Sequence, residues 1–276
     1  MKPVRFDYAR PADLAAAVAL GGRGDAVVKF IAGGQSLGPM LNLRLVQPDL
    51  LVDITAIAEL KRVDQTADAL ILGSCITHAD IEDGRVPDVT GGAMRAVAAG
   101  IAYRAVRNRG TVGGSLAHAD PSADWISALS ALGAQAIVHG ARGERRIAVE
   151  SLMTGVFESG LEPGELLTGV EILRLSPSAR WGYYKHCRKT GELAHAIGAY
   201  LDDPERGVCR AVIGATGTRP LVFGDAAALF GGGAPGGAID RGFAERAMAA
   251  HGMADAIEQQ IHFACLRRAV AQAHRA

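Results

Sequence analysis

The segment FIAGGQSLGPMLNLRL, Phe30–Leu45, ends an apolar run at two adjacent glycines. The run Val27–Ala32 predicts a short buried strand, because its apolar residues are almost uninterrupted. Directly after it, Gly33–Leu37 offers five consecutive backbone N–H donors with little side-chain bulk, ahead of Pro39, which has no N–H. Such a nest of amides suits a phosphate or pyrophosphate, although a structural turn is the better explanation of this loop taken alone.

A second glycine-containing segment, GTVGGSLAHADPSAD at Gly110–Asp124, raises the same question. Its candidate donors, through amides and hydroxyls, are Thr111, Gly113, Gly114 and Ser115. Asp124 has two interpretations. Its carboxylate could accept hydrogen bonds from ribose hydroxyls, or it could lie in the first turn of a helix, where its negative charge interacts favourably with the helix dipole. Together the two loops fit a dinucleotide that spans both.

The overall composition excludes several classes of partner. The chain has 276 residues, which suits two domains, and 49% of them are apolar. Because 29 basic residues balance 29 acidic ones, we expect neither a nucleic acid nor an anionic membrane as partner. The sequence contains no apolar stretch long enough for a transmembrane segment and no apolar core of a signal peptide. We therefore expect a cytoplasmic protein, either free or at the inner face of the cytoplasmic membrane.

The metal-ligating residues are scattered. The four cysteines form no CxxC pair, which argues against a disulfide framework and against a complete zinc or iron–sulfur site on this chain. The histidines of the C-terminal helices have no acidic or cysteine partner at ligand spacing, so we expect no metal site. His78, in THADIE, is interpreted as a structural residue at a helix start.

The periodicity predicts a mixed α+β fold. Apolar runs predict strands at Val27–Ala32, Leu50–Ile54, Ala69–Gly73, Gln135–His139, Leu166–Leu173, Trp181–Cys187 and Val208–Ala215. Helical patterns cover Asp13–Leu20, Gly92–Arg104, Trp125–Leu132, Ala226–Phe230, Phe243–His251 and Ile257–His274. Thr77 is expected to cap a helix, with Asp80 completing a capping box. Ser176–Ser178 is the expected domain boundary.

Three further features of the sequence invite interpretation. GGGAPG at Gly231–Gly236 matches a dinucleotide-binding pattern, but it follows a helical segment and contains a proline, so we interpret it as a surface connection. Trp181 and Tyr183 alternate at strand spacing and are expected in the core. The basic cluster Arg104, Arg107 and Arg109 could neutralise a pyrophosphate, meet a partner subunit or form a solvated face.

Four blocks of the sequence, taken in order, resemble one protein family. AGGQSL at Ala32–Leu37, RNRGTVGGSLAHADPSAD at Arg107–Asp124, GELLTGVEI at Gly164–Ile172 and YYKHCRKTGELA at Tyr183–Ala194 carry the resemblance. They resemble the FAD-binding medium subunits of molybdenum hydroxylases, a family that includes xanthine dehydrogenase and carbon monoxide dehydrogenase. The resemblance covers nearly the whole chain.

The resemblance implies a fold and a domain division. The fold would be the FAD-binding fold of the vanillyl-alcohol oxidase (PCMH) type. Residues 1–176 would form an FAD-binding domain with subdomains at about 1–55 and 56–176, and residues 177–276 a smaller α+β domain.

Matching motif positions also imply a set of FAD-binding residues. The pyrophosphate would lie against the first loop, Ala32, Gly33, Gly34, Gln35, Ser36 and Leu37. Its other side would meet Gly110, Thr111, Gly114 and Ser115. The flavin or ribityl chain would contact Ala117, His118, Ile101, Ala102 and Val106. Asp124 would bind ribose hydroxyls, Leu166 and Leu167 would pack near adenine, and Lys185 would lie near the isoalloxazine ring. No catalytic side chain and no metal ligand is implied on this chain.

The sequence departs from the family at three of these places. Ser115 replaces a common Asn, and Gln35 stands where many relatives have His, so both positions keep a hydrogen-bonding side chain. Leu193 stands where some relatives have a Tyr over the flavin, which changes how the flavin face is shielded.

The function implied is that of an electron-transferring subunit of an oxidoreductase. The chain would take electrons from 2Fe–2S clusters of a small subunit and pass them through FAD to NAD, a quinone or oxygen. A large subunit would hold the molybdopterin cofactor, in a dimer of heterotrimers. Two alternatives remain: a stand-alone FAD-dependent oxidase or dehydrogenase, and a non-catalytic flavin-binding partner or assembly protein.

Overall fold

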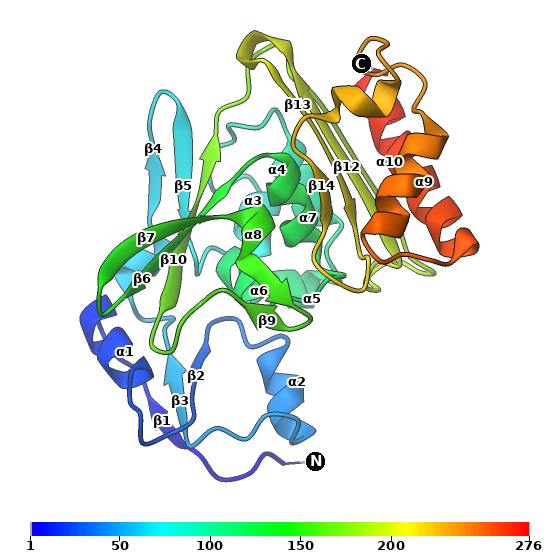
Figure 1. The fold of residues 1–276 in the computed structure, drawn as a ribbon. Coiled ribbons are helices and arrows are strands. Elements are labelled where there is room, and N and C mark those ends of the chain that lie inside the picture. Colours follow the sequence, from blue (N-terminus) through cyan, green and yellow to red (C-terminus); the bar gives the residue numbers. More distant parts are fainter. Residues whose placement is uncertain (1, 276) are drawn as a thin grey trace.

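The computed structural model describes residues 2–275 and combines helices with several sheets. Figure 1 shows the chain passing from a small N-terminal layer, in blue, through a central block to a C-terminal sheet covered by two helices. The α+β prediction is confirmed. The division into domains at residue 176 remains a prediction.

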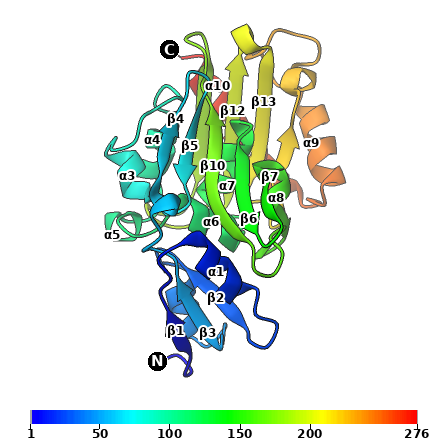
Figure 2. The same ribbon diagram turned by 90° about the vertical axis from the view of Figure 1, so that its left-hand side faces the viewer.

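The N-terminal layer is a parallel three-stranded sheet in the order β1-β3-β2. Its strands are β1 (Asp7–Ala9), β2 (Val28–Ile31) and β3 (Leu50–Asp53). Helix α1 (Leu14–Gly21) packs on it, and begins where the Asp13 side chain accepts the Ala16 N–H at 2.8 Å. Figure 2 shows this layer at one end of the larger sheet. The sequence predicted β2, β3 and α1 to within two residues.

The central sheet is antiparallel, in the order β4-β5-β10-β6-β7. Its strands are β4 (Val63–Gln65), β5 (Ala69–Gly73), β6 (Gln135–Gly140), β7 (Gly143–Ala148) and β10 (Leu166–Leu173). It shares the largest core with helices α3 (His78–Glu82), α4 (Ala93–Ala99), α6 (Val112–His118), α7 (Asp124–Ala131) and α8 (Val149–Leu152). The short helix α5 (Arg104–Arg107) follows α4 and buries no residue. A small hairpin, β8 (Met153–Gly155) and β9 (Glu158–Ser159), follows α8.

Two local predictions in this block have different outcomes. The capping box of α3 is confirmed, because the Thr77 hydroxyl accepts the Asp80 N–H at 3.1 Å and the Asp80 carboxylate accepts the Thr77 N–H at 3.0 Å. The single helix predicted over Gly92–Arg104 is wrong. Helix α4 ends at Ala99, and Ala102 adopts a left-handed φ of 42° before α5 begins. The alanine-rich pattern contained no sign of this interruption other than Gly100.

The C-terminal sheet is antiparallel, with the order β11-β12-β13-β14. Its strands are β11 (Arg180–His186), β12 (Ala196–Asp203), β13 (Val208–Gly214) and β14 (Leu221–Phe223). Helices α9 (Arg241–Ala250) and α10 (Ala256–Ala273) cover one side, and α7 packs against β12 and β13. Glycines allow this close packing: a Cβ on Gly198 would lie 2.5 Å from the Cys265 backbone in α10, and one on Gly214 would lie 1.9 Å from the Ser127 hydroxyl in α7.

The remaining predictions concern turns and core residues. Short 3-10 helices occur at Ala58–Lys61, Pro204–Arg206 and Ala226–Phe230, the last of which was predicted as helical. Gly231–Gly236 is an irregular connection before α9, as predicted. Trp181 and Tyr183 stack with ring centroids 6.5 Å apart and pack against buried cores, which confirms their interpretation. No helix in residues 2–275 combines the length and apolar character that crossing a membrane requires.

Candidate functional site

A cleft of about 410 Å³ lies where the N-terminal layer meets the central block. Both glycine segments line it, as do the start of β10 and the turn between α4 and α5. The residues that the resemblance assigned to FAD therefore come together, although they lie far apart in the sequence. Eighteen of them line the cleft: Ala32, Gly33, Gly34, Gln35, Ser36, Leu37, Ile101, Ala102, Val106, Gly110, Thr111, Gly114, Ser115, Ala117, His118, Asp124, Leu166 and Leu167. Lys185 does not.

The first loop presents the predicted row of amides. Among residues 2–275, no hydrogen bond uses the backbone N–H groups of Gly33–Leu37. The row ends at Gly38, whose N–H donates to the Gly34 carbonyl at 2.9 Å. Gly34 adopts a φ of 69°, a left-handed conformation that costs glycine little. Five adjacent unpaired donors in a cleft wall are the kind of arrangement that suits an anion.

The two glycine segments touch each other at Gly33, which lines the cleft. A Cβ on Gly33 would lie 1.9 Å from the Arg109 carbonyl oxygen, so no larger residue fits without backbone movement. The Arg109 Nε also lies 3.5 Å from the Gly33 carbonyl oxygen. The loops that the sequence suggested as a pair therefore form one continuous wall.

The second segment differs from its prediction, because it is mostly a helix. Thr111 caps α6, and its hydroxyl accepts the Gly114 N–H at 3.0 Å. The N–H groups of Gly113 and Ser115 donate to the Ser74 and Thr111 carbonyls, each at 3.0 Å. These three amides therefore already donate within the protein, and their contribution to ligand binding stays a prediction. Of these four residues, the Thr111 N–H and the Ser115 hydroxyl make no hydrogen bond within residues 2–275.

Asp124 begins α7 in a buried setting, with its side chain only 7% exposed. Its carboxylate accepts hydrogen bonds from the Tyr183 hydroxyl at 2.7 Å and from Lys185 Nζ at 3.0 Å. Burial raises the pKa of Asp124, and Lys185 opposes that rise. The interpretation of Asp124 as a first-turn helix residue is confirmed. It also lines the cleft, and its binding of ribose hydroxyls stays a prediction.

Lys185 reaches this carboxylate from β11, behind the cleft wall. Its Nζ also donates to the Gly100 carbonyl at 2.8 Å, at the end of α4. Lys185 thereby joins the C-terminal sheet to the turn that carries Ile101 and Ala102.

The sequence analysis did not assign several lining residues to the site. These are Lys29, Phe30, Ile31, Met40, Val46, Ile54, Ser74, His78, Asp120, Ala123, Phe157, Leu161 and Glu165. Gly113 and Leu193, which the sequence analysis did consider, line the cleft as well. His78 is the first residue of α3, and its imidazole is buried next to Gly110. The interpretation as a structural residue at a helix start is therefore confirmed, and His78 also lines the cleft. Phe157 lies in the turn between β8 and β9, with its ring centroid 5.0 Å from that of His118 and the two planes tilted by 32°. The sequence around it carries no pattern that points to the cleft.

The basic cluster is divided among three settings. Arg104 pairs with Glu82 and Asp83, Arg107 pairs with Glu82, and Arg109 lies over the first loop. None of the three lines the cleft. The cations of Arg104 and Arg107 are therefore engaged with carboxylates.

The fold and the site together define a nucleotide-cofactor-binding protein whose cleft is lined by a row of free amides and by apolar side chains. Residues 4–173 match the family described as the FAD binding domain in molybdopterin dehydrogenase. The chain belongs to this family: it is an FAD-binding medium subunit of the molybdenum hydroxylases, and thus part of an oxidoreductase.

Individual relatives support this assignment. Caffeine dehydrogenase subunit beta from Pseudomonas sp. (strain CBB1) is 33% identical over 227 residues, which are 81% of this chain and 77% of that relative. A solved structure of carbon monoxide dehydrogenase from Hydrogenophaga pseudoflava, lacking the Mo-pyranopterin moiety, matches with a TM-score of 0.85 at 28% identity, over 99% of this chain and 98% of the other. Quinoline 2-oxidoreductase from Pseudomonas putida 86 matches with a TM-score of 0.84 at 32% identity, over the same shares.

Proposed function

We propose that the cleft binds FAD and that the chain relays electrons from a partner subunit to an external acceptor. The observation that carries this proposal is the row of five unpaired amides at Gly33–Leu37, in the first loop of a family that binds FAD. Donors in a row, without side chains between them, match the oxygens of a pyrophosphate. The apolar side chains that also line the cleft suit a flat ring system.

The residues fall into three groups by their role. The first loop would hold the pyrophosphate, assisted by Thr111 and Ser115 from α6. Leu166 and Leu167 would contact the adenine, and Asp124 would accept ribose hydroxyls through the lone pairs that Tyr183 and Lys185 leave free. Ile101, Ala102, Val106, Ala117 and His118 would contact the flavin and its ribityl chain.

When bound, FAD supplies the redox chemistry, because its ring system takes up electrons and releases them. The protein holds the ring in place and sets the charge around it. Lys185, anchored to Asp124 and to the Gly100 carbonyl, puts a positive charge behind the flavin-facing turn. A cation there would favour negative charge on the reduced ring. No side chain needs to move a proton to or from an organic substrate.

The partners follow from the relatives. One is a medium chain of carbon monoxide dehydrogenase and another a subunit of a caffeine dehydrogenase. We propose that this chain assembles with a large molybdopterin-binding subunit and a small subunit with 2Fe–2S clusters, as a dimer of heterotrimers. The acceptor would be NAD, a quinone or oxygen.

The domain division and the location are also part of the proposal. Residues 1–176 would form the FAD-binding domain and residues 177–276 a second domain. The protein would lie in the cytoplasm or at the inner face of the cytoplasmic membrane.

Purification of the tagged chain from its native host tests this proposal. Flavin, iron and molybdenum should elute in one peak with two other chains. The isolated chain should bind one FAD, and donors such as reduced 2Fe–2S protein should reduce it only when the partner subunits are present. FAD on a solitary chain that oxidises an organic substrate would overturn the relay, and no FAD after reconstitution would overturn the cleft assignment.

A further inference from the structure

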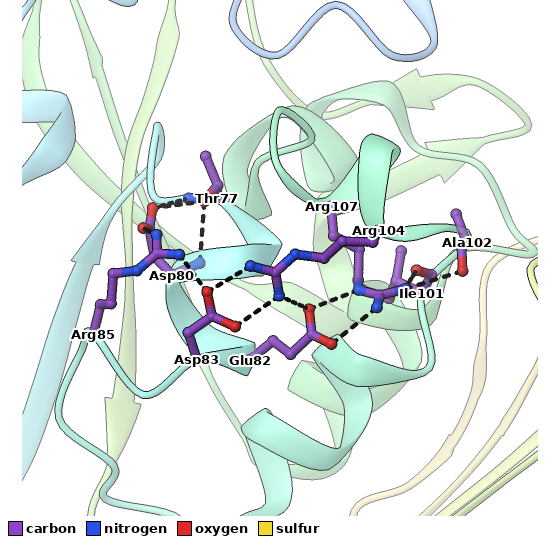
Figure 3. Close-up of polar contacts among 9 residues, drawn as sticks. All are labelled: Thr77, Asp80, Glu82, Asp83, Arg85, Ile101, Ala102, Arg104 and Arg107. Carbon is purple, nitrogen blue, oxygen red and sulfur yellow. Dashed lines mark hydrogen bonds and ion pairs between the residues drawn. The ribbon is translucent and has the colours of Figure 1, made fainter.

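Arg107 holds together a helix and the turn that lines the cleft (Figure 3). Its side chain is only 12% exposed. On one side, Nε and Nη2 donate to the Glu82 carboxylate of α3 at 2.8 and 2.9 Å. On the other side, Nη1 donates to the Ile101 and Ala102 carbonyls at 3.0 and 3.1 Å. One guanidinium therefore fixes two successive carbonyls relative to α3.

The turn itself is strained and needs such support. Ala102 has a φ of 42°, a left-handed conformation that residues with a Cβ rarely adopt. The preceding Gly100 carbonyl is held by Lys185 Nζ. Two side chains from different elements therefore hold three consecutive carbonyls, those of Gly100, Ile101 and Ala102.

The position of these carbonyls determines where the N–H groups point. A trans peptide places its C=O and N–H on opposite sides, so the Ala102 N–H points away from Arg107 when the Ile101 C=O points toward it. Within residues 2–275 this N–H makes no hydrogen bond. Ile101 and Ala102 line the cleft and Arg107 does not. The unpaired donor therefore belongs to the cleft side of the turn.

We propose that Arg107, oriented by Glu82, is a positioning residue that presents the Ala102 N–H to an acceptor atom of the bound flavin ring. This inference rests on the proposed function, since the ligand it names is the FAD of that cleft. A donor fixed before the ligand arrives favours binding, and it favours whichever redox state of the ring carries more negative charge. Arg107 would thus affect both FAD affinity and the flavin reduction potential without touching the cofactor.

The same ion-pair network contains a matched control. Arg104 also pairs with Glu82, at 2.7 Å, and is 45% exposed. Within residues 2–275 its side chain makes no hydrogen bond to the Ile101 or Ala102 carbonyl. R104Q and R107Q each remove one positive charge from the same carboxylate. Only R107Q frees the two carbonyls.

The experiment compares wild type, R107Q, R107K, E82Q and R104Q. Each chain is titrated with FAD, the visible flavin spectrum and reduction potential are recorded, and thermal unfolding is measured without FAD. R107Q should bind FAD about tenfold more weakly, on the scale of one lost hydrogen bond, with a shifted spectrum and a lower potential. R107K should recover part of the loss, E82Q should be intermediate, and R104Q should match wild type. If R107Q does not fold, the FAD affinity, flavin spectrum and reduction potential of R107K and E82Q decide whether Arg107 has a positioning role.

The possible failures are distinguishable. If wild type binds FAD and all variants bind it equally, with the same spectrum, Arg107 has no positioning role, even where R107Q unfolds at a lower temperature. If R104Q weakens binding as much as R107Q, the effect is one of net charge, and the role assigned to the turn is overturned. If wild type binds no FAD, the proposed function fails, and the ligand named here fails with it.

Discussion

The indole N–H of Trp125 donates to Nδ1 of His78 at 3.0 Å inside the central core. Because an indole N–H can only donate, Nδ1 is unprotonated and the neutral ring carries its proton on Nε2. That nitrogen lies beside Gly110 at the cleft wall. Burial and the nearby Arg107 lower the pKa of His78 from 6.5 to about 4. The ring is therefore neutral in the folded protein at any pH above that value.

This relationship predicts an acid-sensitive stability. In the unfolded chain His78 takes up a proton below its ordinary pKa, whereas in the folded chain it does so only near 4. Stability that is fully present above pH 6.5 is therefore lost as the pH falls toward 4, up to about 3 kcal/mol. Urea unfolding at pH 7.5, 6, 5 and 4 should show this loss in wild type. H78N, which keeps an acceptor for Trp125, should lose much less between pH 6.5 and 4. Equal slopes in the two proteins would contradict the prediction.

Much of the fold could be predicted from the sequence where a pattern was local. Strand β10 was predicted with its bounds, and the Thr77–Asp80 capping box was found from two residues. Strand β12 was missed, because Ala196–Asp203 is buried on both sides, between α10 and α7, and therefore shows no alternation of apolar and polar residues. Its small residues matter only through contacts with distant helices.

The candidate site shows the same division between local and distant causes. The amide row at Gly33–Leu37 was predictable, since glycines after a strand are visible in the sequence. The helix at Val112–His118 was not, because two glycines weaken its propensity while Thr111 and the Ser74 carbonyl stabilise its first turn. Arg107 could not be assigned among three roles until Glu82 was seen beside it.

Substitution of Gly33 should separate the two loops. A Cβ there would lie 1.9 Å from the Arg109 carbonyl oxygen, and neither backbone can yield cheaply. G33A should cost about 1–3 kcal/mol of stability and weaken FAD binding about tenfold or more, as measured by calorimetry and unfolding. Gly38, in α2 (Leu37–Asn42) of the same segment, has no atom within 4 Å of a built Cβ. G38A should bind FAD normally and be more stable by about 0.5–1 kcal/mol. Similar losses in both variants would show that the close approach at Gly33 is not the cause.

Removal of Lys185 should expose the cost of a buried charge. Asp124 and Lys185 are 7% and 12% exposed, so K185M leaves a carboxylate with little water around it. We expect a loss of about 3–5 kcal/mol in the free energy of unfolding, and the double variant K185M/D124N should recover part of it. FAD binding should weaken as well, since the Gly100 carbonyl loses its anchor.

The control for this pair lies on the surface of the same region. Arg188 and Glu192 form an ion pair in which Arg188 is 76% exposed. R188Q should leave unfolding and FAD binding unchanged, because water screens such a pair. If K185M lowered the free energy of unfolding as little as R188Q, the buried pair would stabilise the fold no more than a surface pair does. Asp124 would then not be what holds the Lys185 charge in place.

Leu193 offers a gain-of-function test at the mouth of the cleft. It lines the cleft but is 57% exposed, so it covers little of what lies beneath it. A tyrosine at this position, as the sequence comparison with this family suggested for some of its members, would add an aromatic ring next to the flavin. Because aromatic pairs contribute about 0.5–1.5 kcal/mol beyond their buried area, L193Y should tighten FAD binding by about threefold to tenfold and slow the reaction of the reduced protein with oxygen. L45Y, at a leucine that is 70% exposed and outside the cleft, should change neither quantity. Unchanged affinity in L193Y would place the flavin ring away from this residue.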